Sequence, residues 1–124
     1  MSATAKPLVY VAGPISGDPF GCVRQSAEAF TWLRGLGCVP FCPQWSVIAE
    51  MVDPRPYEDW MAYDFDVIAR CDALLRLPGE SPGAEREVVE ASVAGIPVFR
   101  YHPSITSTVI DFVAEWHERR AVGL

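Results

Sequence analysis

Short apolar runs alternate with segments of helical periodicity along almost the whole chain, and this alternation limits the fold more than any other feature. Four runs are short and end near glycine or proline, which is typical of buried strands. They cover residues 8–12, 38–41, 73–77 and 97–101. Helical spacing is found over residues 20–36, 57–71, 82–94 and 105–120. A strand–helix order repeated four times predicts an α/β fold with a parallel sheet between helices.

Three loops at one edge of this predicted sheet are the candidate ligand-binding segments. Ligands of such sheets bind outside the carboxyl ends of the strands. The loops in question are residues 13–20, 44–56 and 78–83. Prolines and weak periodicity predict that residues 44–56 form one long irregular loop, and loops of that length are often functional lids.

Composition narrows the class of partner. The 124 residues predict one domain spanning 1–124, half of the residues are apolar, and the formal charge is −6. Acidic residues are spread along the sequence without a clustered basic face, so we expect no nucleic-acid polymer as partner. One small phosphorylated ligand held by backbone amides remains compatible with this charge.

The cysteines and the first residues indicate the compartment. The four cysteines form no CxxC pair, so free thiols in a reducing cytosol are expected. Cys38 and Cys42 could form a metal site with a histidine only by coincidence of folding, and we expect no metal. The sequence contains no signal peptide and no membrane span, which predicts a cytoplasmic protein without a membrane partner.

The third helix begins with an anion-binding pattern. Ser81 is a preferred N-cap residue, Pro82 suits the first helical position, and Gly83 follows. The amides of Gly83 and Ala84 are then free to face an anion at the positive end of the helix. A well-capped helix with nothing bound is the alternative interpretation.

One carboxylate lies on the apolar face of that helix. Glu87 shares this face with Ala84, Ala91 and Ala94, at offsets of −3, +4 and +7. A carboxylate on a buried face is costly unless it is paired or used. Because the nearby helix N-terminus partly supports its charged form, Glu87 is a candidate nucleophile.

Asp64 interrupts the apolar face of the preceding helix in the same way, four residues from Trp60 and from Ile68. Asp64 is either functional or a buried, hydrogen-bonded structural acid. Asp72, just after this helix, is expected to cap backbone amides. A pair of inward acids suits glycosidic chemistry, in which one attacks the anomeric carbon while the other assists the leaving group.

The first loop is rich in glycine, which would let its backbone approach a sugar or a phosphate. Its residues are Gly13, Pro14, Ile15, Ser16 and Gly17. The loop matches neither GxGxxG nor the P-loop, so dinucleotide and triphosphate binding are not predicted.

Together these pieces resemble the nucleoside 2-deoxyribosyltransferase superfamily, especially its branch of 2′-deoxynucleoside 5′-monophosphate N-hydrolases. The resemblance covers residues 10–109. It is based on the opening Tyr10-Val11-Ala12-Gly13-Pro14, on Asp64 with Asp72 eight residues later, and on Ser81-x-Gly83-x-x-x-Glu87-x-x-x-Ala91.

The resemblance implies a role for each acid. Glu87 matches the nucleophile that forms a covalent glycosyl-enzyme, and Asp64 matches the residue that contacts the base and assists its departure. Tyr10 matches the tyrosine that hydrogen-bonds the glutamate. The resemblance further implies a flavodoxin- or Rossmann-like sheet of four to five strands, no cofactor, and a homodimer or larger homo-oligomer with shared sites.

Two serines favour a nucleotide substrate. Ser81 matches the phosphate-binding serine of the hydrolases, where the transferases carry an acid. Ser107 resembles a serine that reaches the phosphate from the neighbouring subunit. Residues 121–124 lack the polar segment with which the transferases complete their site.

The chain departs from the hydrolases at two positions. Its first loop has no arginine, so phosphate binding would rest on Ser16, Ser81, the helix amides and either Arg24 or Arg100. Glu85 replaces a glycine that normally lies two residues before the nucleophile. Trp45, in the long loop, either stacks on the base or anchors packing.

Three functions follow from these residues. The first is hydrolysis of the N-glycosidic bond of a (deoxy)nucleoside 5′-monophosphate through an adduct on Glu87. The second is base exchange between free deoxynucleosides. The third is a catalytically silent nucleotide-binding module that senses or regulates.

Overall fold

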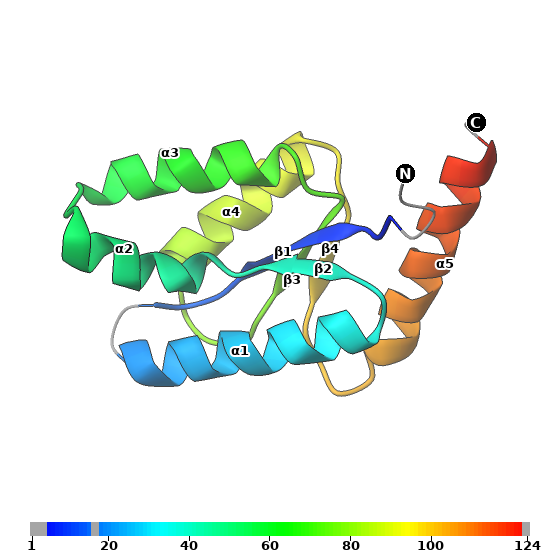
Figure 1. The fold of residues 1–124 in the computed structure, drawn as a ribbon, viewed down its shortest axis with the longest axis horizontal. Helices are drawn as coiled ribbons and strands as arrows, with labels where there is room; N and C mark the ends of the chain where they lie inside the picture. The colour runs from blue at the N-terminus through cyan, green and yellow to red at the C-terminus, as the bar shows by residue number, and fades with distance from the viewer. Residues whose placement is uncertain (1–4, 16–17, 123–124) are drawn as a thin grey trace.

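Four parallel strands form the single sheet of the computed structural model, which describes residues 5–15 and 18–122 (Figure 1). They are β1 (Leu8–Ala12), β2 (Val39–Phe41), β3 (Ala73–Arg76) and β4 (Val98–Arg100). Their order in the sheet is β2-β1-β3-β4, and every neighbouring pair is parallel. The α/β fold predicted from the alternation is confirmed.

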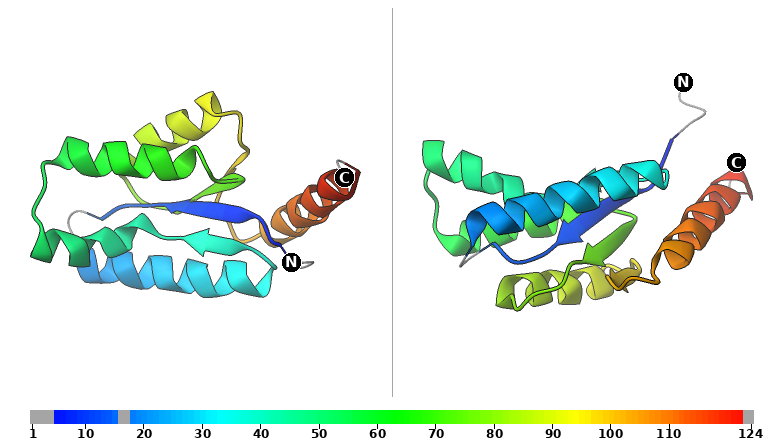
Figure 2. Two further views of the ribbon diagram at one scale, coloured as in Figure 1. Left: turned by 45° about the horizontal axis from the view of Figure 1, so that its top comes forward. Right: turned by 90° about the horizontal axis from the view of Figure 1, so that it is seen from below.

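Helices cover both faces of the sheet (Figure 2). One face packs against α1 (Pro19–Gly35) and α5 (Thr106–Val122), and the other packs against α3 (Tyr57–Ile68) and α4 (Pro82–Val93). Side chains of a strand alternate between the two faces. Val9 and Val11 therefore pack towards α1 and α5, whereas Tyr10 and Ala12 pack towards α3 and α4.

Local signals in the sequence fix the ends of these helices. Asp18 caps α1 by accepting a hydrogen bond from the amide of Gly21 (3.0 Å), and Ser81 caps α4. Past the other ends, Gly37 has φ +90° and Gly95 has φ +79°, a left-handed conformation that glycine adopts without strain.

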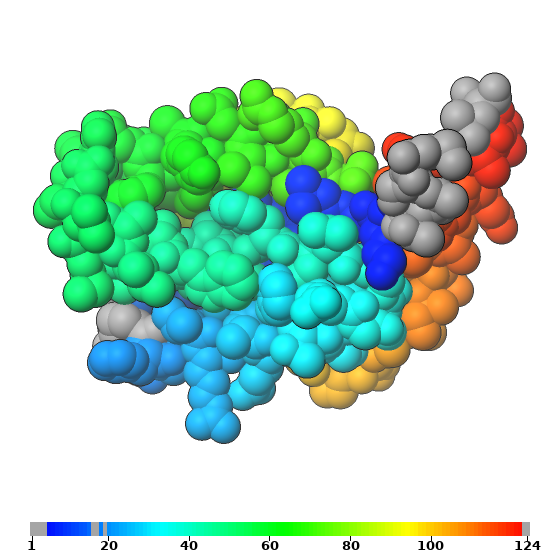
Figure 3. All heavy atoms as spheres, in the orientation of Figure 1, coloured from blue at the N-terminus to red at the C-terminus, as the bar shows by residue number. Residues whose placement is uncertain are grey.

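The prediction of an irregular loop over residues 44–56 is wrong for most of its length. The chain forms a 3₁₀ turn, η1 (Pro43–Trp45), and then a helix, α2 (Ser46–Val52). No residue of α2 is buried, although Val47, Ile48, Met51 and Val52 are apolar and share one side of the helix. With only seven residues, α2 is too short for this periodicity to distinguish it from a loop. With α3, this helix forms one end of the molecule, and α5 lies at the other (Figure 3).

Chain order produces a crevice between two neighbouring strands. From β1 the chain moves outward to β2, and then crosses back over β1 to reach β3. The loops after β1 and β3 therefore diverge at the carboxyl end of the sheet, which is where doubly wound folds bind ligands.

Two smaller expectations can also be compared with the structure. Within residues 5–15 and 18–122, no helix is long and apolar enough to cross a membrane. All four cysteines are free.

Candidate active site

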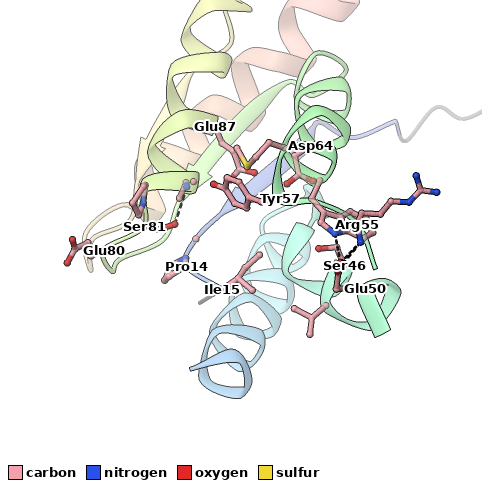
Figure 4. Close-up of a pocket in the computed structure, with 17 residues that line it drawn as sticks. Pro14, Ile15, Ser46, Glu50, Arg55, Tyr57, Asp64, Glu80, Ser81 and Glu87 are labelled. Carbon is pink, nitrogen blue, oxygen red and sulfur yellow. Dashed lines mark hydrogen bonds between the residues drawn. The ribbon is translucent and has the colours of Figure 1, made fainter. Parts of the chain in front are cut away.

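A cavity of about 810 Å³ opens at the carboxyl ends of β1 and β3 (Figure 4). Its walls come from the loop after β1, from α2 and the segment that follows it, from α3, and from the loop that leads into α4. The predicted site residues found along these walls are Gly13, Ile15, Asp64, Ser81, Gly83 and Glu87.

Glu87 is the buried acid of α4, with 5% of its surface exposed. Its helical neighbours Ala84 and Ala91 are buried beside it, as their spacing predicts. Ala94 is exposed, contrary to the expectation that it shares this face, because it caps the helix after the last turn. Tyr10 reaches Glu87 from β1, and its hydroxyl donates a 2.5 Å hydrogen bond to Oε2.

Asp64 faces the same cavity from α3 and is 7% exposed. It lies between Met61 and Ile68 in the buried stripe of that helix. Asp66 is exposed, and Asp72 accepts a 2.8 Å hydrogen bond from the amide of Leu8. The sequence therefore separates the inward acid of this region from its two neighbours correctly.

Burial determines the protonation of this acid pair. The pKa of Glu87 is raised to about 8, chiefly by burial; the hydrogen bond from Tyr10 opposes this rise and the charge of Asp64 adds to it. Burial also raises the pKa of Asp64. We expected the helix N-terminus to support ionised Glu87, but Glu87 is the sixth residue of α4, beyond the first turn in which that effect acts. The pair therefore retains a proton that two solvated carboxyls would lose.

Tyr10 is a hydrogen-bond donor at any ordinary pH. Burial, together with the charges of Glu87 and Asp64, raises the pKa of its hydroxyl far above the usual value. Its ring packs against Phe41 with 5.8 Å between the ring centroids, which fixes the direction of the hydroxyl.

The N-terminus of α4 differs from the expected arrangement at one amide. Ser81 Oγ accepts a 3.1 Å hydrogen bond from the amide of Ala84, so this amide is not free for an anion. The amide of Gly83 has no such cap. A Cβ atom at Gly83 would lie 2.6 Å from the Tyr57 hydroxyl, so the aromatic wall of the cavity lies directly against this glycine.

The first loop reaches the cavity through Gly13, Pro14 and Ile15. Ser16 and Gly17, which were expected to bind the substrate, lie outside the described residues. A Cβ atom at Gly13 would meet Nε2 of Gln44 at 3.0 Å. The sequence interpretation missed Gln44: it is fully buried, and its side-chain amide meets no partner among the described residues.

Trp45 and Ser107, which were predicted to bind the substrate, are not among the described residues that line the cavity. Trp45 is 42% exposed and packs against Phe30 with 5.1 Å between ring centroids, as in the packing-anchor alternative. Ser107 is exposed on α5. The helices α5 and α2 lie towards opposite ends of the molecule (Figure 1). The contact of Ser107 with the site of a neighbouring subunit stays a prediction.

No sequence pattern predicted the side of the cavity that α2 and α3 form. Glu50 of α2 accepts hydrogen bonds from Trp60 Nε1 (2.5 Å) and from the amide of Arg55 (2.9 Å), which ties α2 to α3. Tyr57 adds an aromatic wall beside the N-terminus of α4. Trp60 and Tyr57 belong to the predicted helix over residues 57–71, but their place in the cavity wall depends on the position of α2, which was not predicted.

Glu85 is exposed, as its place on α4 predicts, but it is paired with two arginines. It bonds Arg76 (2.8 Å) and Arg100 (2.9 and 3.1 Å). Arg100 and then Arg76 lower the pKa of Glu85 to about 2, so it is ionised. Two arginines thereby compensate the negative charge that departs from the hydrolase pattern.

Solved structures share this fold. A conserved protein from Enterococcus faecalis V583 has a TM-score of 0.65 at 23% identity, covering 81% of this chain and 66% of its own, so the present chain spans just under two thirds of its length. A 2-deoxyribosyltransferase from Bacillus psychrosaccharolyticus has a TM-score of 0.56 at 22% identity, with coverages of 77% and 72%. A CMP N-glycosidase from Clostridium botulinum has a TM-score of 0.54 at 20% identity, with coverages of 86% and 82%.

Sequence comparison identifies the family. No curated protein sequence matches the chain. The family described as "Domain of unknown function (DUF4406)" matches residues 7–100, which include all four strands and the acid pair. Since the match covers well over half of the chain, the protein belongs to the DUF4406 family.

Proposed function

We propose that the protein hydrolyses the N-glycosidic bond of a (deoxy)nucleoside 5′-monophosphate through a covalent intermediate on Glu87. One observation carries the proposal: the buried carboxyls of Glu87 and Asp64 enter one cavity from two helices, and Tyr10 holds Glu87. Two carboxyls that flank one reacting carbon are the usual equipment for glycosidic cleavage with retention.

The proposed reaction has two steps. Glu87 attacks C1′, the bond between C1′ and the base nitrogen breaks, and Asp64 gives its proton to the nitrogen that receives the electron pair. Water then attacks C1′ of the adduct and gives a proton to Asp64, while the bond between C1′ and Glu87 breaks. The products are the free base and the sugar phosphate, and both carboxyls return to their first state.

The protonation of the acid pair supplies the one proton that the proposed reaction needs. Attack needs one ionised carboxylate and departure of the base needs one proton. Raised pKa values for both Glu87 and Asp64 keep one proton on the pair near neutral pH. The interaction between the two carboxyls raises the pKa of Glu87 and lowers that of Asp64, so the proton lies on Glu87 in the free protein and passes to Asp64 before attack. The hydrogen bond from Tyr10 favours the ionised Glu87 that this transfer produces.

The phosphate assignment rests on the N-terminus of α4. Ser81 and the amide of Gly83 meet the cavity there, at the positive end of the helix. Arg76 and Arg100 neutralise Glu85, which would otherwise repel a phosphate. The fold shared with a CMP N-glycosidase and a 2-deoxyribosyltransferase is consistent with N-glycosidic chemistry.

Base exchange between free nucleosides is the second candidate, and the charge of the cavity wall favours it. Glu50 and Glu80 line the cavity. Among its described lining residues Arg55 is the only cationic side chain, and its guanidinium is paired with Asp53 at 2.9 Å. An uncharged nucleoside would meet less repulsion here than a phosphate dianion.

Release of free base from a panel of nucleoside and deoxynucleoside 5′-monophosphates, and from the parent nucleosides, tests the proposal. We expect release from a monophosphate and its loss in Glu87→Gln, whereas the matched control Glu90→Gln stays active. Acceptor base is added in a parallel arm, in which a new nucleoside identifies exchange. Saturable nucleotide binding without turnover would identify a silent binding module and contradict the proposal.

A further inference from the structure

Arg76 is a buried cation at the end of an otherwise apolar strand. Its neighbours Leu74, Leu75 and Leu77 are buried, and Arg76 itself is 6% exposed. A guanidinium in such a place is costly unless nearly all of its donors are satisfied. The contacts of Arg76 therefore indicate which part of the protein it holds in place.

The guanidinium makes three sets of bonds. Its Nη1 donates to the carbonyl of Leu77, its Nη2 donates to the carbonyl of Gly79 (2.8 Å), and its Nε donates to Oε2 of Glu85 (2.8 Å). Glu85 is held in turn by Arg100. The rigid fork of an arginine can join two carbonyls and a carboxylate at once, which a lysine cannot.

Both carbonyls belong to the loop between β3 and α4. Gly79 has φ +114°, and a Cβ atom there would lie 2.9 Å from Pro14, so this loop also packs against the loop after β1. Two residues after Gly79, Ser81 meets the cavity and caps α4. Arg76 is not among the described residues that line the cavity, so it can act on a ligand through the loop or through its charge, which lowers the pKa of Glu87.

We propose that Arg76 is a positioning residue, whose fork to Leu77, Gly79 and Glu85 sets the place of Ser81 at the 5′ end of the substrate. The inference rests on the proposed function, because Ser81 is the residue that would contact the 5′ group. Glu85 is then a counter-ion that holds the fork, and this accounts for an acid at a position where the resembling hydrolases carry glycine.

Arg76→Lys keeps the charge and removes the fork, which makes it the main test. With the monophosphate that the unaltered protein cleaves fastest, we expect KM to rise about ten-fold and kcat to change less than about three-fold, as for a lost binding contact. KM for the parent nucleoside should stay within about two-fold. Arg119→Gln removes an exposed arginine on α5 and serves as the control.

A double-mutant cycle separates positioning from a general loss of structure. If Arg76 acts through Ser81, Arg76→Lys should add no further rise in KM to Ser81→Ala, since residues that act through one contact are not additive. Equal penalties for monophosphate and nucleoside, or fully additive penalties in the cycle, would overturn the inference.

Amide exchange of Ala84, followed by NMR, tests the same inference without turnover. This amide is protected by Ser81 Oγ, so its exchange reports how well Ser81 is placed. We expect about ten-fold faster exchange in Arg76→Lys and unchanged exchange in Arg119→Gln. Glu85→Ala, at a half-exposed position, is a second variant for the case that Arg76→Lys does not fold. Unchanged exchange of Ala84 in the folded variant would overturn the role of Arg76, whereas absence of base release by the unaltered protein would contradict only the proposed function.

Discussion

The Tyr10 hydroxyl donates a 2.5 Å hydrogen bond to Oε2 of Glu87, although the two residues lie 77 positions apart in the sequence. The bond joins the central strand of the sheet to the helix that carries the acid. It stabilises the ionised carboxylate, because a hydrogen bond donated to the charged form lowers the pKa of the acid.

Removal of this donor should shift the pH dependence of the reaction. In Tyr10→Phe the pKa of Glu87 rises further, by about one to two units if the bond contributes what hydrogen bonds to charged groups usually do. The acid limb of the pH–rate profile should then move to higher pH, with slower base release at pH 7. Tyr63→Phe, an exposed tyrosine on α3, is the matched control. A profile that is the same in Tyr10→Phe as in the unaltered protein would contradict the assignment.

The raised pKa of Glu87 also predicts how stability varies with pH. Glu87 titrates near pH 8 in the folded protein and near its ordinary value of 4.5 in the unfolded chain. Between these values the folded state holds a proton that the unfolded state has lost. The free energy of unfolding should therefore fall as pH rises from about 4.5 to about 8, by at most about 1.4 kcal/mol per pH unit.

Urea denaturation of the unaltered protein and of Glu87→Gln at pH 5, 6, 7 and 8 measures this effect. The variant cannot titrate at position 87, so its stability should depend less on pH, and the difference between the two proteins should grow up to pH 8. Parallel curves for the two proteins would show that Glu87 is not the titrating group.

A methyl group at Gly83 should disturb the aromatic wall. The Cβ of Gly83→Ala would lie 2.6 Å from the Tyr57 hydroxyl, so the tyrosine must move away from the N-terminus of α4. We expect weaker substrate binding, by about ten-fold in KM, as for the loss of one positioned wall of a site. Gly35→Ala meets open space and should leave KM unchanged. Restored KM in the double variant Gly83→Ala, Tyr57→Phe would assign the effect to the clash; a KM that stays high would assign it elsewhere.

Substitution of Ser81 should separate helix capping from phosphate binding. Ser81→Ala loses the cap on Ala84 and should cost about 1 kcal/mol of stability. Ser81→Asp keeps a capping oxygen but adds a charge, so stability should stay near that of the unaltered protein while the monophosphate is bound about ten-fold or more weakly. Thermal melting and KM values for a monophosphate and its nucleoside check both effects. If Ser81→Asp binds both substrates equally well, Ser81 does not contact the phosphate.

Much of the fold follows from sequence periodicity because strands and helices here have a buried side. The four strands and the helices α1, α3, α4 and α5 each carry an apolar pattern that packs on the sheet. The helix α2 also has apolar residues, but it is only seven residues long and none of them is buried, so periodicity did not distinguish it from a loop. Prolines before and after it strengthened that wrong interpretation.

The site residues could be predicted where a charged side chain occupies a position in the apolar stripe of its helix. Glu87 and Asp64 are acids in apolar stripes, and each is buried beside one cavity. Tyr10 looks like an ordinary strand residue, and only the resemblance to a known family singled it out. Arg76 and Gln44 were missed because their surroundings come from segments distant in sequence, which no local pattern describes.

The absence of buried residues from α2 has a consequence for how this protein can change over time. A helix that contributes nothing to the core can accept new side chains at little cost to folding, whereas the acid pair and Tyr10 lie among packed neighbours that resist replacement. We therefore expect natural variation, and successful laboratory evolution of new substrate preferences, to concentrate in α2 and to leave Glu87, Asp64 and Tyr10 unchanged.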